Sequence, residues 1–200
     1  MPDLSERWRS FWTLNDADLR YADLARRYGE AHRAYHTLEH IEHCLDELEE
    51  ARDLAERPEE VELALWLHDA VYDPRARDNE ERSADLAKSF AVTRGIDGDR
   101  TAGLVLATRH DSEPSTPDSR LVVDIDLSIL GQPVERFDKY ERGIRQEYAW
   151  VPEPRFREVR AKILGGFLAR PAIYRVAHFR VKYEARAREN LRRSLGDLRG

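Results

Sequence analysis

Apolar residues recur every three or four positions along nearly the whole chain, and this helical period is the feature that most constrains the fold. Capping residues, glycine or proline separate the periodic segments, as at Asp16, Gly29, Pro58 and Gly95. Charged residues make up 36% of the chain, enough to solvate the face of each helix that lies opposite its apolar stripe. The pattern therefore predicts an all-α fold built from amphipathic helices.

The period places nine helices along the chain. They are expected over residues 4–12, 16–29, 35–55, 58–73, 78–95, 99–110, 133–150, 153–169 and 173–195. Residues 111–119 are expected to form a loop because they contain two prolines, whereas residues 121–131 could begin as a strand or form a helix. No repeat, low-complexity tract or long linker interrupts the chain, so we expect a single domain over residues 1–200.

Composition excludes several classes of protein. Hydrophobic residues make up 41% of the chain, which is enough for a core and excludes a fully disordered chain. Cys44 is the single cysteine, so a disulfide-stapled secreted scaffold is excluded. No apolar run approaches the roughly 18 residues of a membrane span, and the first twelve residues lack the apolar core of a signal peptide. We therefore expect a cytoplasmic protein that does not bind membranes.

The net charge of −6 is unevenly distributed. Residues 155–200 hold 13 Lys and Arg against 4 Asp and Glu, whereas the rest of the chain holds 20 against 35. A basic segment can bind nucleic acid. We interpret it instead as basic helices that pack against an acidic body, and we do not expect nucleic acid as a partner.

Four histidines lie within twelve positions of the sequence: His32, His36, His40 and His43. Side chains four residues apart share a helix face at about 6 Å. Two of these imidazoles could therefore face one cavity, although any one of them alone is more simply a surface or core histidine.

Acidic side chains occur in two further apolar settings. His68 and Asp69 follow the run LALWL, and Asp124 and Asp126 lie within VVDIDLSILG. A buried carboxylate is costly unless a partner compensates its charge, and that partner could be an arginine, a turn or a divalent metal ion. One histidine of residues 35–55, the His68-Asp69 pair and one of the two later aspartates would give nitrogen and oxygen ligands that suit a divalent ion.

This order of residues resembles the HD superfamily of metal-dependent phosphohydrolases, in which a histidine, a His-Asp pair and a distant aspartate lie on an all-helical bundle. The chain is most similar to a group of small predicted HD phosphohydrolases, through six segments in order: YHTLEH, LALWLHDAVY, DNEERSA, ATRH, DIDLSILG and IRQEYAWV. The similarity extends from Tyr35 to the final helix. It implies one HD-type domain, with a metal-site core at about residues 35–130 and C-terminal helices at residues 133–195.

The resemblance also implies the ligands of one divalent metal ion. They are His40, His68, Asp69 and Asp126, with Asp124 as the alternative to Asp126. Mn, Fe, Co, Ni or Zn suits such a set, and Mg, which prefers oxygen ligands, suits it less well.

The reaction implied is hydrolysis of a phosphate ester, in a nucleotide or another small phosphorylated molecule, by metal-activated water. Asp69 would serve catalysis as well as metal binding. The YHTLEH segment is similar to that of cyclic-nucleotide phosphodiesterases, whose first histidine donates a proton to the leaving oxygen, and this assigns that role to His36. His110 is the only histidine between the His-Asp pair and the last aspartate. It is therefore placed near the substrate, as an alternative proton donor, rather than on a second metal ion.

An acidic protein needs local cations to attract a phosphate. The candidates for substrate binding are Arg109, Lys139, Arg142 and Arg145, although each could equally be a solvated charge on a helix face. Glu80 could hold a metal-bound water or an arginine, or it could simply be an acid at the start of a helix.

Two other functions compete with this one. Residues 36–40, HTLEH, match the inverted zinc-protease motif, with Glu39 as the base and His36 and His40 as zinc ligands. That motif leaves His68, Asp69 and Asp126 unexplained. The second alternative is a non-catalytic HD-like module that binds a nucleotide or a protein, which would bind tightly without turnover.

Overall fold

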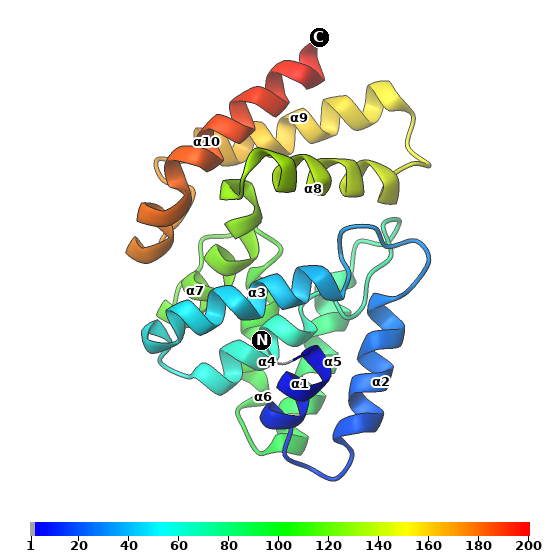
Figure 1. Ribbon diagram of the computed structural model, residues 1–200, viewed down its shortest axis with the longest axis vertical. Coiled ribbons are helices and arrows are strands. Elements are labelled where there is room, and N and C mark those ends of the chain that lie inside the picture. Colours follow the sequence, from blue (N-terminus) through cyan, green and yellow to red (C-terminus); the bar gives the residue numbers. More distant parts are fainter. Residues whose placement is uncertain (1–2) are drawn as a thin grey trace. The chain divides into compact units, whose positions relative to one another are not determined.

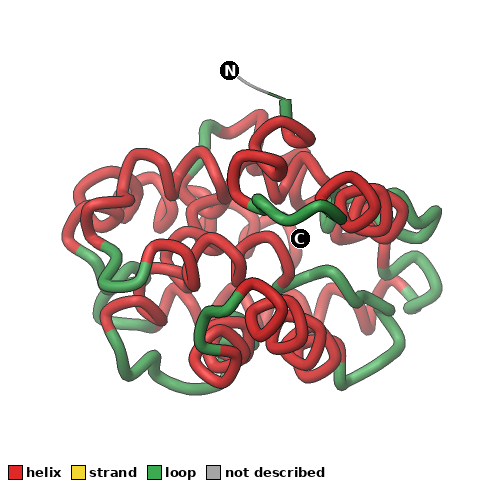
Figure 2. The backbone as a smooth tube through the Cα atoms, turned by 90° about the horizontal axis from the view of Figure 1, so that it is seen from below, coloured by secondary structure: helices red, strands yellow, loops and turns green. Residues whose placement is uncertain are grey.

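The structure, a computed structural model, describes residues 3–200, and all the regular secondary structure within them is helical (Figures 1 and 2), which confirms the all-α prediction. The α-helices are α1 (Leu4–Phe11), α2 (Ala17–Tyr28), α3 (Leu38–Ala51), α4 (Pro58–Leu67), α5 (Asn79–Arg94), α6 (Gly98–Ala107), α7 (Pro117–Asp126), α8 (Val134–Glu147), α9 (Glu153–Ala169) and α10 (Ala177–Arg199). Two short 3₁₀-helices are η1 (Arg52–Leu54) and η2 (Leu127–Gly131).

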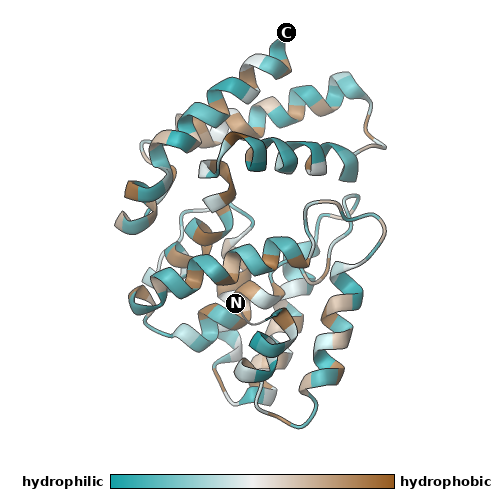
Figure 3. Ribbon diagram, in the orientation of Figure 1, coloured by the Kyte–Doolittle hydropathy of each residue, from teal (hydrophilic) through white to brown (hydrophobic). Residues whose placement is uncertain are grey.

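Most helices are amphipathic. Hydrophobic residues are spaced along otherwise hydrophilic ribbons in Figure 3, as the 3.6-residue period requires. Across residues 3–200 we find no helix whose length and hydropathy would let it span a bilayer. Residues 121–131 are helical, so the helical alternative for this ambiguous segment is confirmed.

The chain divides into two compact units, one up to Val123 and one from Asp124 onward. The division falls within α7, and no linker separates the units. The single domain over residues 1–200 stays a prediction.

Aromatic side chains form the centre of the first unit. Trp8 stacks on Trp12 with ring centroids 5.4 Å apart and meets the edge of Trp66 at 5.1 Å, while Trp12 lies 5.3 Å from Phe90. These rings come from α1, α4 and α5 and from the residue that follows α1. Trp66 and the other apolar residues of α4 are fully buried, as expected for a central helix.

The start of α3 differs from the prediction. The helix begins at Leu38 rather than at Tyr35, because Thr37 has an extended backbone with φ −120° and ψ 178°. His36 therefore precedes the helix that carries His40. The expectation that these two histidines share one helix face is wrong.

The end of α4 also differs. The helix stops at Leu67 and His68 is its C-cap, whereas we expected the helix to continue to residue 73. A tight turn follows, in which the amide of Ala70 donates to the carbonyl of Leu67 at 3.0 Å. The turn places His68 and Asp69 at the end of a buried helix.

The second unit is built from η2, α8, α9 and α10. Asn190 of α10 donates to the carbonyls of Leu130 and Gln132, both at 2.9 Å, and so holds η2 against α10. A Cβ added at Gly131 would lie 2.5 Å from the Cβ of Tyr183. Glycine is therefore required where η2 passes α10.

Candidate metal centre

Two histidine rings from different helices meet in the first unit. His40 lies in the first turn of α3 and His68 caps α4, and both are buried. Their ring planes are inclined at 67°, and the two Nε2 atoms are 3.0 Å apart. A pair of Nε2 atoms at this distance can share a proton or bind one metal ion.

The second ring nitrogen of each histidine has its own partner. His68 Nδ1 donates to the carbonyl of Leu65 at 3.0 Å, which leaves the lone pair on Nε2. His40 Nδ1 lies 3.0 Å from the hydroxyl of Tyr35. Metal-binding histidines typically have such a partner, because it fixes the tautomer and the ring orientation. Both rings are thus oriented with Nε2 toward the same point.

Asp69 and Cys44 bring further ligand atoms to this point. Asp69 Oδ2 lies 3.1 Å from His68 Nε2 and 3.5 Å from His40 Nε2. Cys44 lies one turn after His40 on α3, with Sγ 3.7 Å from His40 Nε2. The ligand atoms of His40, Cys44 and His68 all lie within 4.8 Å of one another. We call His40, Cys44, His68 and Asp69 the histidine cluster. The donor atoms of its three buried side chains are close enough to one another to hold a metal ion.

The spacing of the donor atoms fits a metal ion. Nitrogen and oxygen ligands lie about 2.0–2.2 Å from such an ion, so adjacent ligands are about 3.0–3.5 Å apart in tetrahedral or octahedral geometry. The three nitrogen and oxygen atoms of His40, His68 and Asp69 are 3.0, 3.1 and 3.5 Å apart. This mixture of donors suits the later transition ions and zinc better than Mg²⁺.

Neighbouring histidines stabilise the ionised form of the Asp69 carboxylate. Burial alone would raise the pKa of Asp69, but the neighbouring His68, His36 and His40 hold that pKa below its usual range. Asp69 is therefore ionised within the cluster at neutral pH, as a metal ligand must be.

Arg33 joins the two segments that carry the cluster. Its guanidinium is fully buried and donates to the carbonyl of His36 at 3.0 Å and to that of Asp69 at 2.8 Å. It also donates to the carbonyl of Ala70 and pairs with Glu30. The role of Arg33 could not be predicted from the sequence, because no local pattern distinguishes one buried arginine from the many exposed ones.

His36 lies beside the cluster without belonging to it. Its ring is 4.3 Å from that of Tyr72 and 6.2 Å from that of His40. His32 differs, because it is exposed and its Nε2 meets the carbonyl of Tyr72 at 2.8 Å. Because Glu39 is exposed and His36 precedes α3, the arrangement does not favour the inverted zinc-protease motif.

The two aspartates near residue 125 have different roles in the second unit. Both carboxylate oxygens of Asp124 accept from backbone amides, of Arg175 at 2.8 and 3.0 Å and of Val176 at 2.6 Å. Val176 is the N-cap of α10, so Asp124 satisfies donors at the start of that helix. Asp126 is the half-buried last residue of α7.

The predicted substrate-binding cations do not converge within either unit. Arg109 pairs with Glu81 and with Asp111 in the first unit. Arg145 pairs with Glu153 at 2.8 Å and donates to carbonyls of the turn between α8 and α9. Lys139 and Arg142 are exposed on α8. Their roles in substrate binding stay predictions.

His110 follows the end of α6 and has a φ of +58°, in the left-handed region that few residues other than glycine adopt. Such strain often occurs at functional positions. Glu80 lies in the first turn of α5, where an acid is favoured by the helix dipole. Their catalytic roles stay predictions.

Comparison with protein-family models, with curated proteins and with solved structures finds no match for this chain. The helical fold and the histidine cluster are compatible with an HD-type domain. The resemblance to that superfamily therefore depends on the six sequence segments and on this geometry.

Proposed function

We propose that the protein is a metal-dependent phosphohydrolase that cleaves a phosphate ester. One observation carries the proposal: two buried Nε2 atoms, 3.0 Å apart, converge with an Asp69 oxygen while both Nδ1 atoms are engaged by other partners. Structural histidines do not need this arrangement, whereas metal-binding histidines do.

His40, His68 and Asp69 would hold the ion, and we assign Asp126 as the fourth ligand. The order of a histidine, a His-Asp pair and a distant aspartate supports this set, and the occupied carboxylate of Asp124 supports Asp126 over Asp124. The ion is proposed to be Mn, Fe, Co, Ni or Zn. The substrate is proposed to be a nucleotide or another small phosphorylated molecule, because the similar proteins of the superfamily act on these.

A bound divalent ion would lower the pKa of a water molecule and draw negative charge from the phosphoryl oxygens. The chain supplies the other functions. Asp69 is held ionised at the edge of the cluster, where its side chain keeps a small exposed area. His36, held against Tyr72, would donate the proton to the leaving oxygen, with His110 as the alternative donor.

The test is release of inorganic phosphate from p-nitrophenyl phosphate and nucleoside monophosphates, with Mn, Co, Ni or Zn added to chelator-treated protein. We expect activity that depends on one of these ions and falls roughly 100-fold or more in Asp69→Asn. Asp85→Asn, which changes an exposed aspartate of α5, is the matched control. Metal binding without turnover of any substrate would favour the non-catalytic module.

A further inference from the structure

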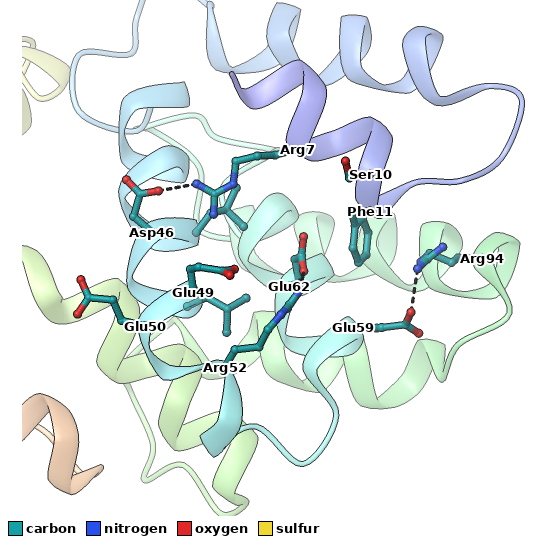
Figure 4. A pocket seen from close by; sticks show the side chains of 12 residues that line it. Arg7, Ser10, Phe11, Asp46, Glu49, Glu50, Arg52, Glu59, Glu62 and Arg94 are labelled. Atoms are coloured by element: carbon teal, nitrogen blue, oxygen red, sulfur yellow. Dashed lines mark hydrogen bonds and ion pairs between the residues drawn. The ribbon is translucent and has the colours of Figure 1, made fainter. Parts of the chain in front are cut away.

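The first unit contains a cavity of about 610 Å³ between α1, α3, α4 and the end of α5 (Figure 4). This volume is within the range of small-molecule sites. It opens on the side of α3 away from the histidine cluster. Glu49, which lines the cavity, is nine residues after His40. Nine helical residues make about two and a half turns, so the two side chains lie on opposite faces of α3. The cavity is therefore distinct from the candidate metal centre.

Part of the lining is apolar and preformed. Phe11, Leu45 and Leu48 are each at most 6% exposed and line the cavity. The guanidinium of Arg94 stacks over the Phe11 ring at 4.6 Å and helps to fix it. A ligand here could lay a short aliphatic chain against this surface.

The arginines that line the cavity are already engaged with carboxylates. Arg52 pairs with Glu62 and Arg94 pairs with Glu59, each through a 2.9 Å hydrogen bond. Arg7 likewise forms an ion pair, with Asp46 (Figure 4). These three arginines and their three carboxylate partners balance in charge, and Glu49, which also lines the cavity, adds a further negative charge. The lining carries an excess of negative charge, which disfavours an anionic ligand.

Two carboxylates point into the cavity from neighbouring helices. Glu49 of α3 and Glu62 of α4 both extend toward its interior in Figure 4. Burial raises the pKa of Glu62, Arg52 and Arg7 act against the rise, and the charge of Glu49 adds to it. A cation placed between these two carboxylates would remove their repulsion.

We propose that this cavity binds a small organic cation, a protonated amine on a short aliphatic chain. The ammonium group would lie between Glu49 and Glu62, and the aliphatic chain would contact Phe11, Leu45 and Leu48. The excess of carboxylates selects the charge of the ligand, and the apolar surface favours an organic cation over a metal ion.

The test is calorimetric titration with 1,4-diaminobutane, with 1,4-butanediol as the neutral analogue of the same length. We expect saturable binding of the diamine only, weakened by roughly tenfold in Glu49→Gln and further in Glu49→Lys, whose own ammonium would enter the cavity. Glu49 is exposed, so neither substitution should unfold the protein, and circular dichroism checks this. Glu42→Gln, on an exposed position of α3 outside the cavity, is the matched control and should bind as the wild type.

Three results would overturn the proposal: no saturable binding of the diamine, equal affinity of wild type and Glu49→Gln, or equal binding of the diol. A fourth is Glu49-dependent binding of Ca²⁺ without binding of the diamine, which would identify a metal site instead. None of these outcomes depends on the histidine cluster, so they do not test the proposed hydrolase.

Discussion

The guanidinium of Arg33 donates to the backbone carbonyl of Asp69 at 2.8 Å, so a buried cation fixes the main chain beside the carboxylate of the histidine cluster. The same guanidinium holds the carbonyl of His36. One side chain thereby sets the distance between the segment before α3 and the turn after α4.

Replacing Arg33 should therefore damage both stability and metal binding. In Arg33→Met, three backbone carbonyls lose a donor and Glu30 loses its arginine partner. We expect a loss of about 3 kcal/mol in the free energy of unfolding and a 10- to 100-fold loss in metal affinity. Urea denaturation and metal titration measure the two effects. Arg26→Met, at an exposed arginine paired with Asp23, should change neither.

The hydroxyl of Tyr35 should affect the metal site more than the stability of the fold. Tyr35→Phe removes the hydrogen bond to His40 Nδ1 but keeps the ring. We expect metal affinity to fall about 10-fold or more while the free energy of unfolding changes by about 1 kcal/mol. Competition with a metal-binding dye measures the affinity, and Tyr21→Phe serves as the control. An unchanged affinity would mean that the hydroxyl does not orient the ring.

The contribution of Asp124 to the free energy of unfolding should fall as pH rises, whereas that of most carboxyl groups rises. Burial outweighs its backbone hydrogen bonds and raises its pKa from 3.8 to about 6. Between these values the folded state binds more protons than the unfolded state, so this contribution to stability falls as pH rises. The fall is up to about 3 kcal/mol between pH 4 and pH 7.

Asp124→Asn isolates this effect from the other carboxyl groups. The free energy of unfolding of the wild type minus that of Asp124→Asn should decrease as pH rises from 4 to 7. Urea denaturation in the presence of a chelator at four pH values measures it, because the chelator removes any contribution of metal. A difference that stays constant, or that increases with pH, would contradict the role assigned to the buried carboxyl.

Replacing two glycines of the second unit by alanine should have opposite effects on stability. A Cβ at Gly131 would lie 2.5 Å from the Cβ of Tyr183, so Gly131→Ala should cost about 1–3 kcal/mol through overpacking. Gly165 lies within α9 with open space around a Cβ, so Gly165→Ala should stabilise by about 0.5–1 kcal/mol. Thermal denaturation of the two variants compares them, and destabilisation by both would mean that α9 packs differently.

The sequence predicted the helices well because their apolar period is local information. The helix ends were less accurate, as at α3, where Thr37 is extended although residues 35–37 lie in a periodic segment. Leu19 shows a related limit: it is an apolar residue of the amphipathic helix α2, yet it is 77% exposed. Local periodicity predicts a helix, whereas packing decides which of its residues are buried.

The candidate ligands were predicted in part. The sequence pointed to His40, His68 and Asp69, which the fold brings together. It did not point to Arg33, Tyr35 or Cys44, whose roles depend on contacts between segments far apart in the chain or on one turn of α3. The resemblance favoured Asp126 over Asp124, but the sequence did not show how Asp124 is used, because its partners are backbone amides about fifty residues away, before α10.

The central claim is that His40, His68 and Asp69 bind a divalent metal ion. Elemental mass spectrometry of protein incubated with Mn, Co, Ni or Zn and then dialysed tests it most directly, on the wild type, on His68→Ala with Asp69→Ala, and on His32→Ala as the control. We predict about one equivalent of a transition metal in the wild type and in His32→Ala, and none in the folded double variant. Metal bound at full occupancy in the double variant, or no metal in the wild type with any of these ions, would contradict the account.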